Sequence, residues 1–160
     1  MKFTTIILLL LPLLLLDGCI TYEDNPECSK YKYITFEELE QLEVKVEAPK
    51  EIQKSGKIVI YNQLLLINEV GKGIHIVDNQ DKTNPIKKVF LNIPGNLNFT
   101  LKDGYIYADS YKNLFTIDIR DLENIQVVKK ITNIFDYNQY FWDWECSYDT
   151  SKGIVIEVEQ

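Results

Sequence analysis

One histidine, His75, is the first residue whose type could support acid–base chemistry, because the chain contains no other. A histidine base needs a partner that orients it and a nucleophile within reach. His75 lies in the middle of an apolar stretch at residues 72–78, and its counterparts forty and eighty positions later are the packing residues Phe115 and Val155. We therefore expect His75 to be packed between sheets and predict no catalytic set. A lone histidine also rules out a metal site built on a histidine pair.

Acidic and amide side chains form a second set that could bind calcium. The set recurs with a spacing of forty residues and comprises Asp78, Asp81, Asn84, Asp118, Asp121 and Asn124. A calcium ion takes about 6–8 oxygen ligands from a converging loop. These residues instead follow predicted strands, where Asp and Asn form turns by accepting hydrogen bonds from nearby backbone amides. The recurrence favours turns, and we predict no bound metal.

The densest group of candidate binding residues is an aromatic run late in the sequence. Its members are Tyr137, Tyr140, Phe141, Trp142, Trp144 and Tyr148. Aromatic faces stack on ligands such as sugars or peptides and are enriched at binding hot spots. The candidate binding surface consists of Tyr140, Phe141, Trp142 and Trp144. The alternative is that the run fills the core of a repeat and covers its open end. Asp143 and Glu145 within the run could bind hydroxyl groups or form the carboxylate pair of a glycan-active enzyme.

The net charge and the composition of one glycine-rich turn exclude some classes of partner and cofactor. The 160 residues include 17 Lys and Arg against 24 Asp and Glu, which gives a formal net charge of −7. This balance argues against nucleic acid, which requires a basic face. The turn Gly71-Lys72-Gly73 lacks the remaining residues of a dinucleotide or phosphate loop, so no cofactor is predicted. The pairs Lys87-Lys88 and Lys129-Lys130 are interpreted as solvated or edge-protecting lysines.

The N-terminus has the pattern of an export signal. Lys2 precedes an apolar run of eleven residues from Ile6 to Leu16, which is shorter than the ~20 residues of a membrane-spanning helix and typical of a secretory signal. The junction Leu16-Asp17-Gly18-Cys19 resembles the bacterial lipoprotein box. The resemblance implies that 1–18 is removed and that lipid on Cys19 anchors the protein in the outer membrane or at the cell surface. An ordinary secretory signal with an incidental cysteine is the alternative.

Two further cysteines, Cys28 and Cys146, would then reside in a compartment where disulfides persist. A bridge between them is one interpretation. The other is that Cys146, which falls at a core position of the third repeat, packs as a small hydrophobic residue.

A short helix precedes the repeats. Thr35 and Glu38 match a capping box, and Ile34 with Leu39 matches a hydrophobic staple. These signals predict a helix over Phe36–Leu42, within a lead-in segment at 34–56 that follows an irregular tether at 19–33.

Short strands with a repeating pattern follow from residue 57. Two hairpins are predicted around the turns Asn62-Gln63 and Asp103-Gly104, and Asp-Gly tolerates positive φ at both turn positions. The strand at 72–78 recurs at 112–118 and 152–158. A period of about 40 residues is typical of four-stranded propeller blades. The sequence therefore predicts an all-β fold, a partial and open β-propeller over 57–160, with repeats at 57–96 and 97–136 and a partial repeat at 137–160.

The same residues resemble a known family, the LVIVP-repeat lipoproteins of Bacteroidetes. The resemblance covers about residues 34–158 and rests on four segments: 71–79, Asn84-Pro85, Asn92-Ile93-Pro94-Gly95-Asn96 and 105–111. It implies propeller-like blades on exported, often surface-attached proteins. Members are usually much longer, so this chain corresponds to their N-terminal portion. The family supplies no established biochemical activity.

Together these features predict an envelope-anchored lipoprotein that acts as a non-catalytic binding or scaffold module. Its partners would be the membrane, through the N-terminal lipid, and a glycan or peptide ligand. An uncovered blade edge near Ile154–Val158 predicts self-association or a partner protein. The alternatives are a glycan-active envelope enzyme that uses loop carboxylates and a truncated remnant of a longer repeat protein.

Overall fold

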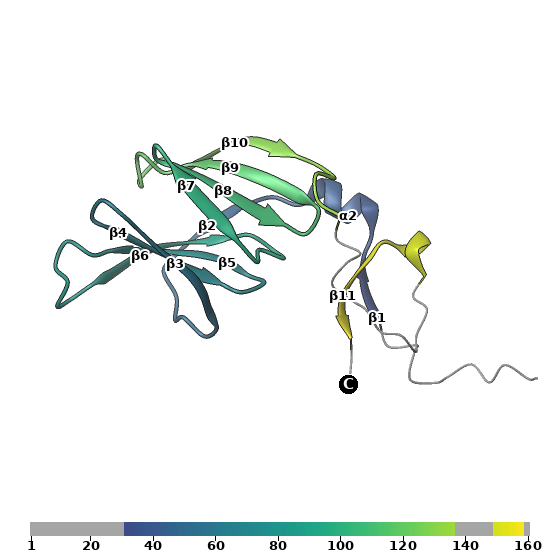
Figure 1. The fold of residues 1–160 in the computed structure, drawn as a ribbon, viewed down its shortest axis with the longest axis horizontal. Coiled ribbons are helices and arrows are strands. Elements are labelled where there is room, and N and C mark those ends of the chain that lie inside the picture. Colours follow the sequence, from purple (N-terminus) through teal and green to yellow (C-terminus); the bar gives the residue numbers. More distant parts are fainter. Residues whose placement is uncertain (1–30, 137–148, 159–160) are drawn as a thin grey trace, which may run out of the picture.

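The computed structural model describes residues 31–136 and 149–158. Within these ranges the strands are antiparallel and form three sheets, accompanied by one α-helix and one short 3-10 helix, which confirms the all-β class (Figure 1). None of the described helices is long and apolar enough to cross a membrane. Cys19, Cys28, Cys146 and the aromatic residues from Tyr137 to Tyr148 lie outside the described residues.

The predicted N-terminal helix is present as α2 (Phe36–Gln41). The Thr35 hydroxyl accepts a hydrogen bond from the Glu38 amide, while the Glu38 carboxylate accepts one from the Thr35 amide at 2.8 Å. Ile34 and Leu39 belong to one buried apolar cluster. The capping box and the staple are therefore both confirmed.

Sheet 1 contains the first repeat and has the strand order β2-β6-β5-β4-β3. Its strands are β2 (Lys45–Glu47), β3 (Ser55–Tyr61), β4 (Leu64–Glu69), β5 (Gly73–Asp78) and β6 (Ile86–Asn92). The central strand β5 is buried over nearly its whole length, because both faces of the sheet are covered. The edge strand β2, which the sequence did not reveal, pairs with β6.

Sheet 2 contains the second repeat and has the order β10-β9-β8-β7. Its strands are β7 (Phe99–Lys102), β8 (Tyr105–Ser110), β9 (Asn113–Asp118) and β10 (Gln126–Ile131). In β8 and β9 burial alternates residue by residue, as expected when only one face of a sheet is fully covered. The turn between β7 and β8 has positive φ at Asp103 (51°) and Gly104 (79°), which confirms the predicted hairpin.

The two sheets pack against each other through one apolar core. Sheet 1 and sheet 2 contribute Leu66, Ile74, Ile76, Ile106, Phe115 and Ile117 among others. Repeat counterparts point in opposite directions relative to this core. Ile74 and Ile76 of β5 face sheet 2, whereas their counterparts Leu114 and Thr116 in β9 alternate with core residues and face away from sheet 1. The repeats are therefore stacked head to tail. We call the faces that meet in the core inner faces and the opposite faces outer faces.

A separate two-stranded ribbon pairs the two ends of the described chain (Figure 1). β1 (Tyr31–Ile34) runs antiparallel to β11 (Ile154–Val158), which follows the 3-10 helix η4 (Thr150–Lys152). β1 begins inside the segment 19–33 that the sequence suggested was irregular, and its pairing covers one edge of the β11 strand. Ile34 and Ile154 pack with Leu39 of α2, which joins the ribbon to the helix.

Lys130 differs from its predicted role as a solvated lysine. Its Nζ atom donates hydrogen bonds to the carbonyl oxygens of Glu40 (2.5 Å) and Leu42 (2.8 Å), at the end of α2. Burial lowers the pKa of Lys130. The cation satisfies carbonyls that the short helix leaves unpaired, and it fixes α2 to strand β10.

Candidate functional site

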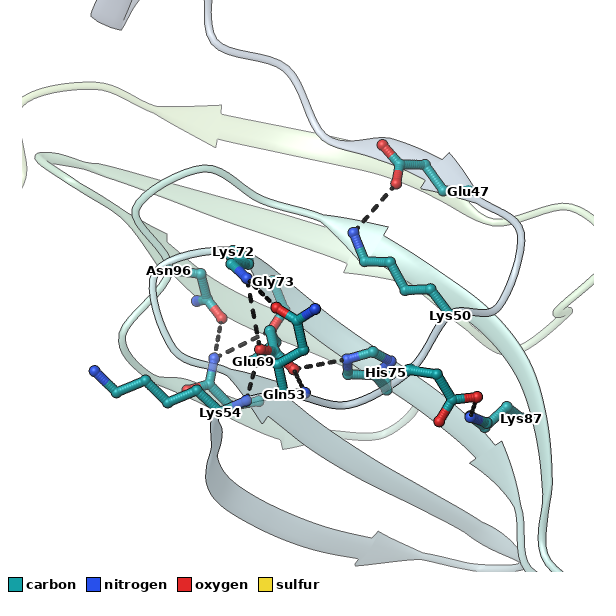
Figure 2. Close-up of polar contacts among 12 residues, drawn as sticks. Glu47, Lys50, Gln53, Lys54, Glu69, Lys72, Gly73, His75, Lys87 and Asn96 are labelled. Carbon is teal, nitrogen blue, oxygen red and sulfur yellow. Dashed lines mark hydrogen bonds and ion pairs between the residues drawn. The ribbon is translucent and has the colours of Figure 1, made fainter.

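His75 is buried, but on the other face of sheet 1 from the one expected. Its side chain is 1% exposed. Because Ile74 and Ile76 on either side of it face the core with sheet 2, His75 points to the outer face of sheet 1. It is thus not packed between the two sheets. A segment at 48–54, which we call the strap, covers it (Figure 2).

Glu69 is the partner of His75 and holds the strap in place. Its carboxylate accepts hydrogen bonds from the backbone amides of Gln53 (3.0 Å) and Lys54 (2.8 Å). The Nε2 atom of His75 lies 3.2 Å from the same carboxylate. Figure 2 shows Glu69 between the imidazole and these strap residues. Glu69 is 1% exposed, so one buried carboxylate joins β4, β5 and the strap.

Further contacts surround this pair. The ring centroid of Phe90, on β6, lies 4.6 Å from that of His75, and the Nζ atom of Lys50 in the strap lies 3.5 Å from the Phe90 centroid. Lys72 donates to the side chain of Gln53 at 2.9 Å. The Nζ atom of Lys72 also lies 3.9 Å from the Glu69 carboxylate, and the charge of Lys50 helps to lower the pKa of His75.

The environment keeps the pair in one protonation state at neutral pH. Burial raises the pKa of Glu69, but the Gln53 and Lys54 amides and the imidazole outweigh it and hold the pKa below 4.5. Burial lowers the pKa of His75 below 6.5, by more than Glu69 raises it. The ionised Glu69 carboxylate therefore accepts a hydrogen bond from the neutral imidazole of His75.

The Glu69–His75 pair is better suited to stabilising the fold than to catalysis. Among the described residues, His75 hydrogen-bonds to Glu69 and to no nucleophile. The carboxylate already has three donors, and both side chains are sealed from solvent. A general base must reach the proton that it removes, and His75 does not reach a substrate in this position.

A second polar network crosses from sheet 1 to sheet 2. Asn68 of β4 donates through Nδ2 to the side-chain oxygen of Asn96, at 2.5 Å, in the connection between the sheets. Asn96 donates in turn to the Asp109 carboxylate at 2.9 Å. Asp109 also accepts hydrogen bonds from the amides of Leu97 (2.7 Å) and Asn98 (3.0 Å). Burial raises the pKa of Asp109, and these donors oppose that effect.

A hollow of about 380 Å³ lies beside Asp109 on the outer face of sheet 2. The residues that line it include Lys57, Thr100, Tyr107, Asp109, Leu114 and Phe135. Its volume lies within the ~300–1,000 Å³ that is usual for ligand pockets. Two other hollows, of about 490 and 390 Å³, flank α2. We call the hollow beside Asp109 the sheet-2 hollow. It combines aromatic walls with hydroxyl and charged groups.

The remaining sequence-based candidates divide into two groups. The recurring acidic residues form turns: Asp78, Asp81, Asp118 and Asp121 each accept a hydrogen bond from the backbone amide two positions later. This confirms the turn interpretation. The binding surface at Tyr140, Phe141, Trp142 and Trp144 lies outside the described residues, as do Asp143 and Glu145 and the Cys28–Cys146 pair.

Comparisons with known proteins assign no function to this chain. No family model, no curated protein and no solved structure matches this chain.

Proposed function

We propose that this chain is an exported, lipid-anchored protein whose repeats form propeller-type blades and act as a non-catalytic binding or scaffold module. The export signal and the Leu16-Asp17-Gly18-Cys19 junction support the anchor. The buried, saturated Glu69–His75 pair supports a role without catalysis.

Head-to-tail stacking supports the blade interpretation, because each blade of a propeller packs one face on the preceding blade and the opposite face on the following blade. The pairing of β1 supports it as well. Ile34 of β1 lies opposite Ile154 of β11, as Leu91 lies opposite Ile74 in sheet 1 and Ile131 lies opposite Leu114 in sheet 2. β1 thus takes the place of a fourth strand beside β11, in a third blade that residues 137–160 would begin.

The observation that carries the binding role is the sheet-2 hollow. It lies on a face against which no described sheet packs, and Phe135 at its rim is 39% exposed. The aromatic run begins two residues after Phe135. A concave surface with aromatic walls and a few polar groups is the usual form of a ligand site.

A screen of glycans and peptides against the full-length protein tests this proposal. Thr100→Arg places a long cation in the hollow from an exposed position and should abolish binding of any ligand found. Ile86→Arg, at a position on β6 that is 53% exposed, is the matched control and should bind normally. A ligand that binds both variants equally well would contradict the site.

Self-association is a second proposal, favoured by exposed apolar residues on β3. Ile58 and Ile60 at the edge of sheet 1 are 56% and 69% exposed, and edge strands of this kind pair with other chains. This edge is distinct from the Ile154–Val158 edge proposed from the sequence. Light scattering after gel filtration should show a dimer or larger assembly that Ile58→Lys and Ile60→Lys together convert to a monomer. A monomeric wild type would contradict it.

A further inference from the structure

The outer face of sheet 2 differs in chemistry from its counterpart in sheet 1. Cross-strand partners place Val59, Leu66 and Ile76 in one row on the inner face of sheet 1. The same row in sheet 2 lies on the outer face and consists of Thr100, Tyr107 and Thr116. Leu64 in the neighbouring row is likewise replaced by Tyr105, whereas Ile74 and its partner Leu91 keep the aliphatic counterparts Leu114 and Ile131.

This change argues against burial of the row Thr100, Tyr107 and Thr116 beneath the third blade that head-to-tail stacking would otherwise place on this face. In sheet 1 the row is buried: Leu66 and Ile76 are 0% exposed, and Val59 packs on the core. In sheet 2 the same positions carry three hydroxyl groups. A hydroxyl that is buried without a partner costs about 1–3 kcal/mol, so an apolar neighbour would be poorly matched to this row.

The charged groups in and beside the sheet-2 hollow already have hydrogen-bond or ion-pair partners within the chain. The Asp109 carboxylate accepts the Leu97, Asn98 and Asn96 donors described above. Lys57 donates through Nζ to the carbonyl of Phe99 at 2.8 Å. Arg120 forms an ion pair with Asp118 at 2.6 Å and lies 4.7 Å from the ring centroid of Tyr105.

The unengaged groups around Tyr107 are neutral, whereas Lys102 and Lys129, at the margins of this face, are exposed and form no ion pair with a described residue. The hydroxyls of Thr100, Tyr107 and Thr116 form no hydrogen bond with any described residue. Tyr107 and Phe135 add aromatic surface to the hollow. Because Arg120 covers the ring of Tyr105, Tyr107 is the tyrosine left to contact a ligand.

The geometry points to a binding site for a neutral oligosaccharide on the outer face of sheet 2, centred on Tyr107 and flanked by Thr100 and Thr116. A sugar ring presents C–H groups that stack on an aromatic face and hydroxyls that exchange hydrogen bonds with protein hydroxyls. A hollow of about 380 Å³ accommodates one such ring, with the row of hydroxyls extending beyond it. This inference rests on the proposed binding function and names the class of ligand.

The test uses calorimetric titration of the full-length protein in a detergent that lacks a sugar headgroup. The probes are cellotetraose, maltotetraose and chitotetraose, with tetragalacturonic acid as the charged comparison. At least one neutral probe should bind more tightly than the acid. Tyr107→Ala should weaken that binding about tenfold or more, whereas Tyr107→Phe, which keeps the ring, should weaken it only a few-fold.

A second variant separates a ligand face from a blade interface. Thr100→Val combined with Thr116→Ile restores the residue types of sheet 1. If the face binds sugar, the variant should lose affinity without gaining thermal stability. A rise in thermal stability with no sugar binding would show a buried interface and overturn the inference.

The remaining outcomes are also decisive. Binding of peptides alone, abolished by Tyr107→Ala, would overturn the sugar class and leave the binding function standing. Sugar binding that Tyr107→Ala does not change would overturn the location. Absence of binding to every probe overturns the inference, and the Thr100→Arg screen then decides separately on the binding function.

Discussion

Glu69→Gln removes the charge that fastens the strap while keeping the size of the side chain. The carboxylate offers both oxygens: one accepts the Lys54 amide, and the other accepts the Gln53 amide and His75. A glutamine has one acceptor oxygen, so its NH₂ group must face at least one of these buried donors. A hydrogen bond to a charged group contributes about 1.5–3 kcal/mol, and an unsatisfied buried donor costs about 1–3 kcal/mol.

We therefore expect Glu69→Gln to lower the free energy of unfolding by about 2–4 kcal/mol, a large share of the ~5–15 kcal/mol of a typical domain. The matched control is Glu51→Gln, within the strap itself. Its ion pair with Lys87 is exposed on the glutamate side, and such pairs contribute about 0.2–1 kcal/mol.

Urea unfolding followed by far-ultraviolet circular dichroism measures both variants. Hydrogen exchange adds a local readout, because the Gln53 and Lys54 amides should exchange faster in Glu69→Gln than in wild type. Equal losses of stability in the two variants, or unchanged exchange at these amides, would refute the assignment of Glu69 as the fastening residue of the strap.

Three further predictions concern pH, a close backbone contact and the anchor. The pKa of His75 is lowered in the folded state, so below pH 6.5 the unfolded chain binds more protons than the folded chain. The free energy of unfolding should therefore fall as the pH is lowered from 7 to 5, and urea titrations of His75→Gln should show a weaker dependence on pH. Gly73→Ala should lower the free energy of unfolding by at least about 3 kcal/mol, because the added Cβ would overlap the Leu91 carbonyl oxygen. Gly71→Ala, where φ is 80° and space is open, should lower it by only about 1–2 kcal/mol. Equal losses in unfolding measurements would contradict this. Palmitate labelling in the host should mark the protein and disappear in Cys19→Ala, and equal labelling would exclude lipidation at that residue.

Local signals were sufficient where a few neighbouring residues determine the structure. The Thr35–Glu38 capping box and the Asp103-Gly104 turn each depend on backbone geometry within four residues, and both were predictable. The forty-residue spacing also predicted which segments become strands. It did so because the alternation of side chains that makes a strand recurs with this spacing in each repeat.

Contacts between distant segments were not predictable in the same way. Glu69 ends an apolar strand, and nothing near it indicates that its partners are the amides of Gln53 and Lys54, which any residue type except proline would provide. The position of His75 was also missed, because alternation shows that a residue faces the opposite side from its neighbours and not which side meets the second sheet. The comparison of Val59 and Leu66 with Thr100 and Tyr107 was not available from the sequence, because the forty-residue spacing pairs them with Phe99 and Ile106. The strand register gives the true counterparts, since the turn between β8 and β9 is one residue shorter than that between β4 and β5. The comparison gained meaning only when head-to-tail stacking showed that the two rows occupy different surroundings.

The pairing of β1 with β11 has a consequence for synthesis. Lys32 and Glu157 form an ion pair across this ribbon although 125 positions separate them in the chain. At about 5–20 residues per second, a ribosome needs roughly 6–25 s to make the intervening residues. Throughout that interval β1 has emerged without its partner strand. An unpaired strand with two tyrosines and an isoleucine is prone to pair with other chains, and a charged residue such as Lys32 within it opposes such pairing.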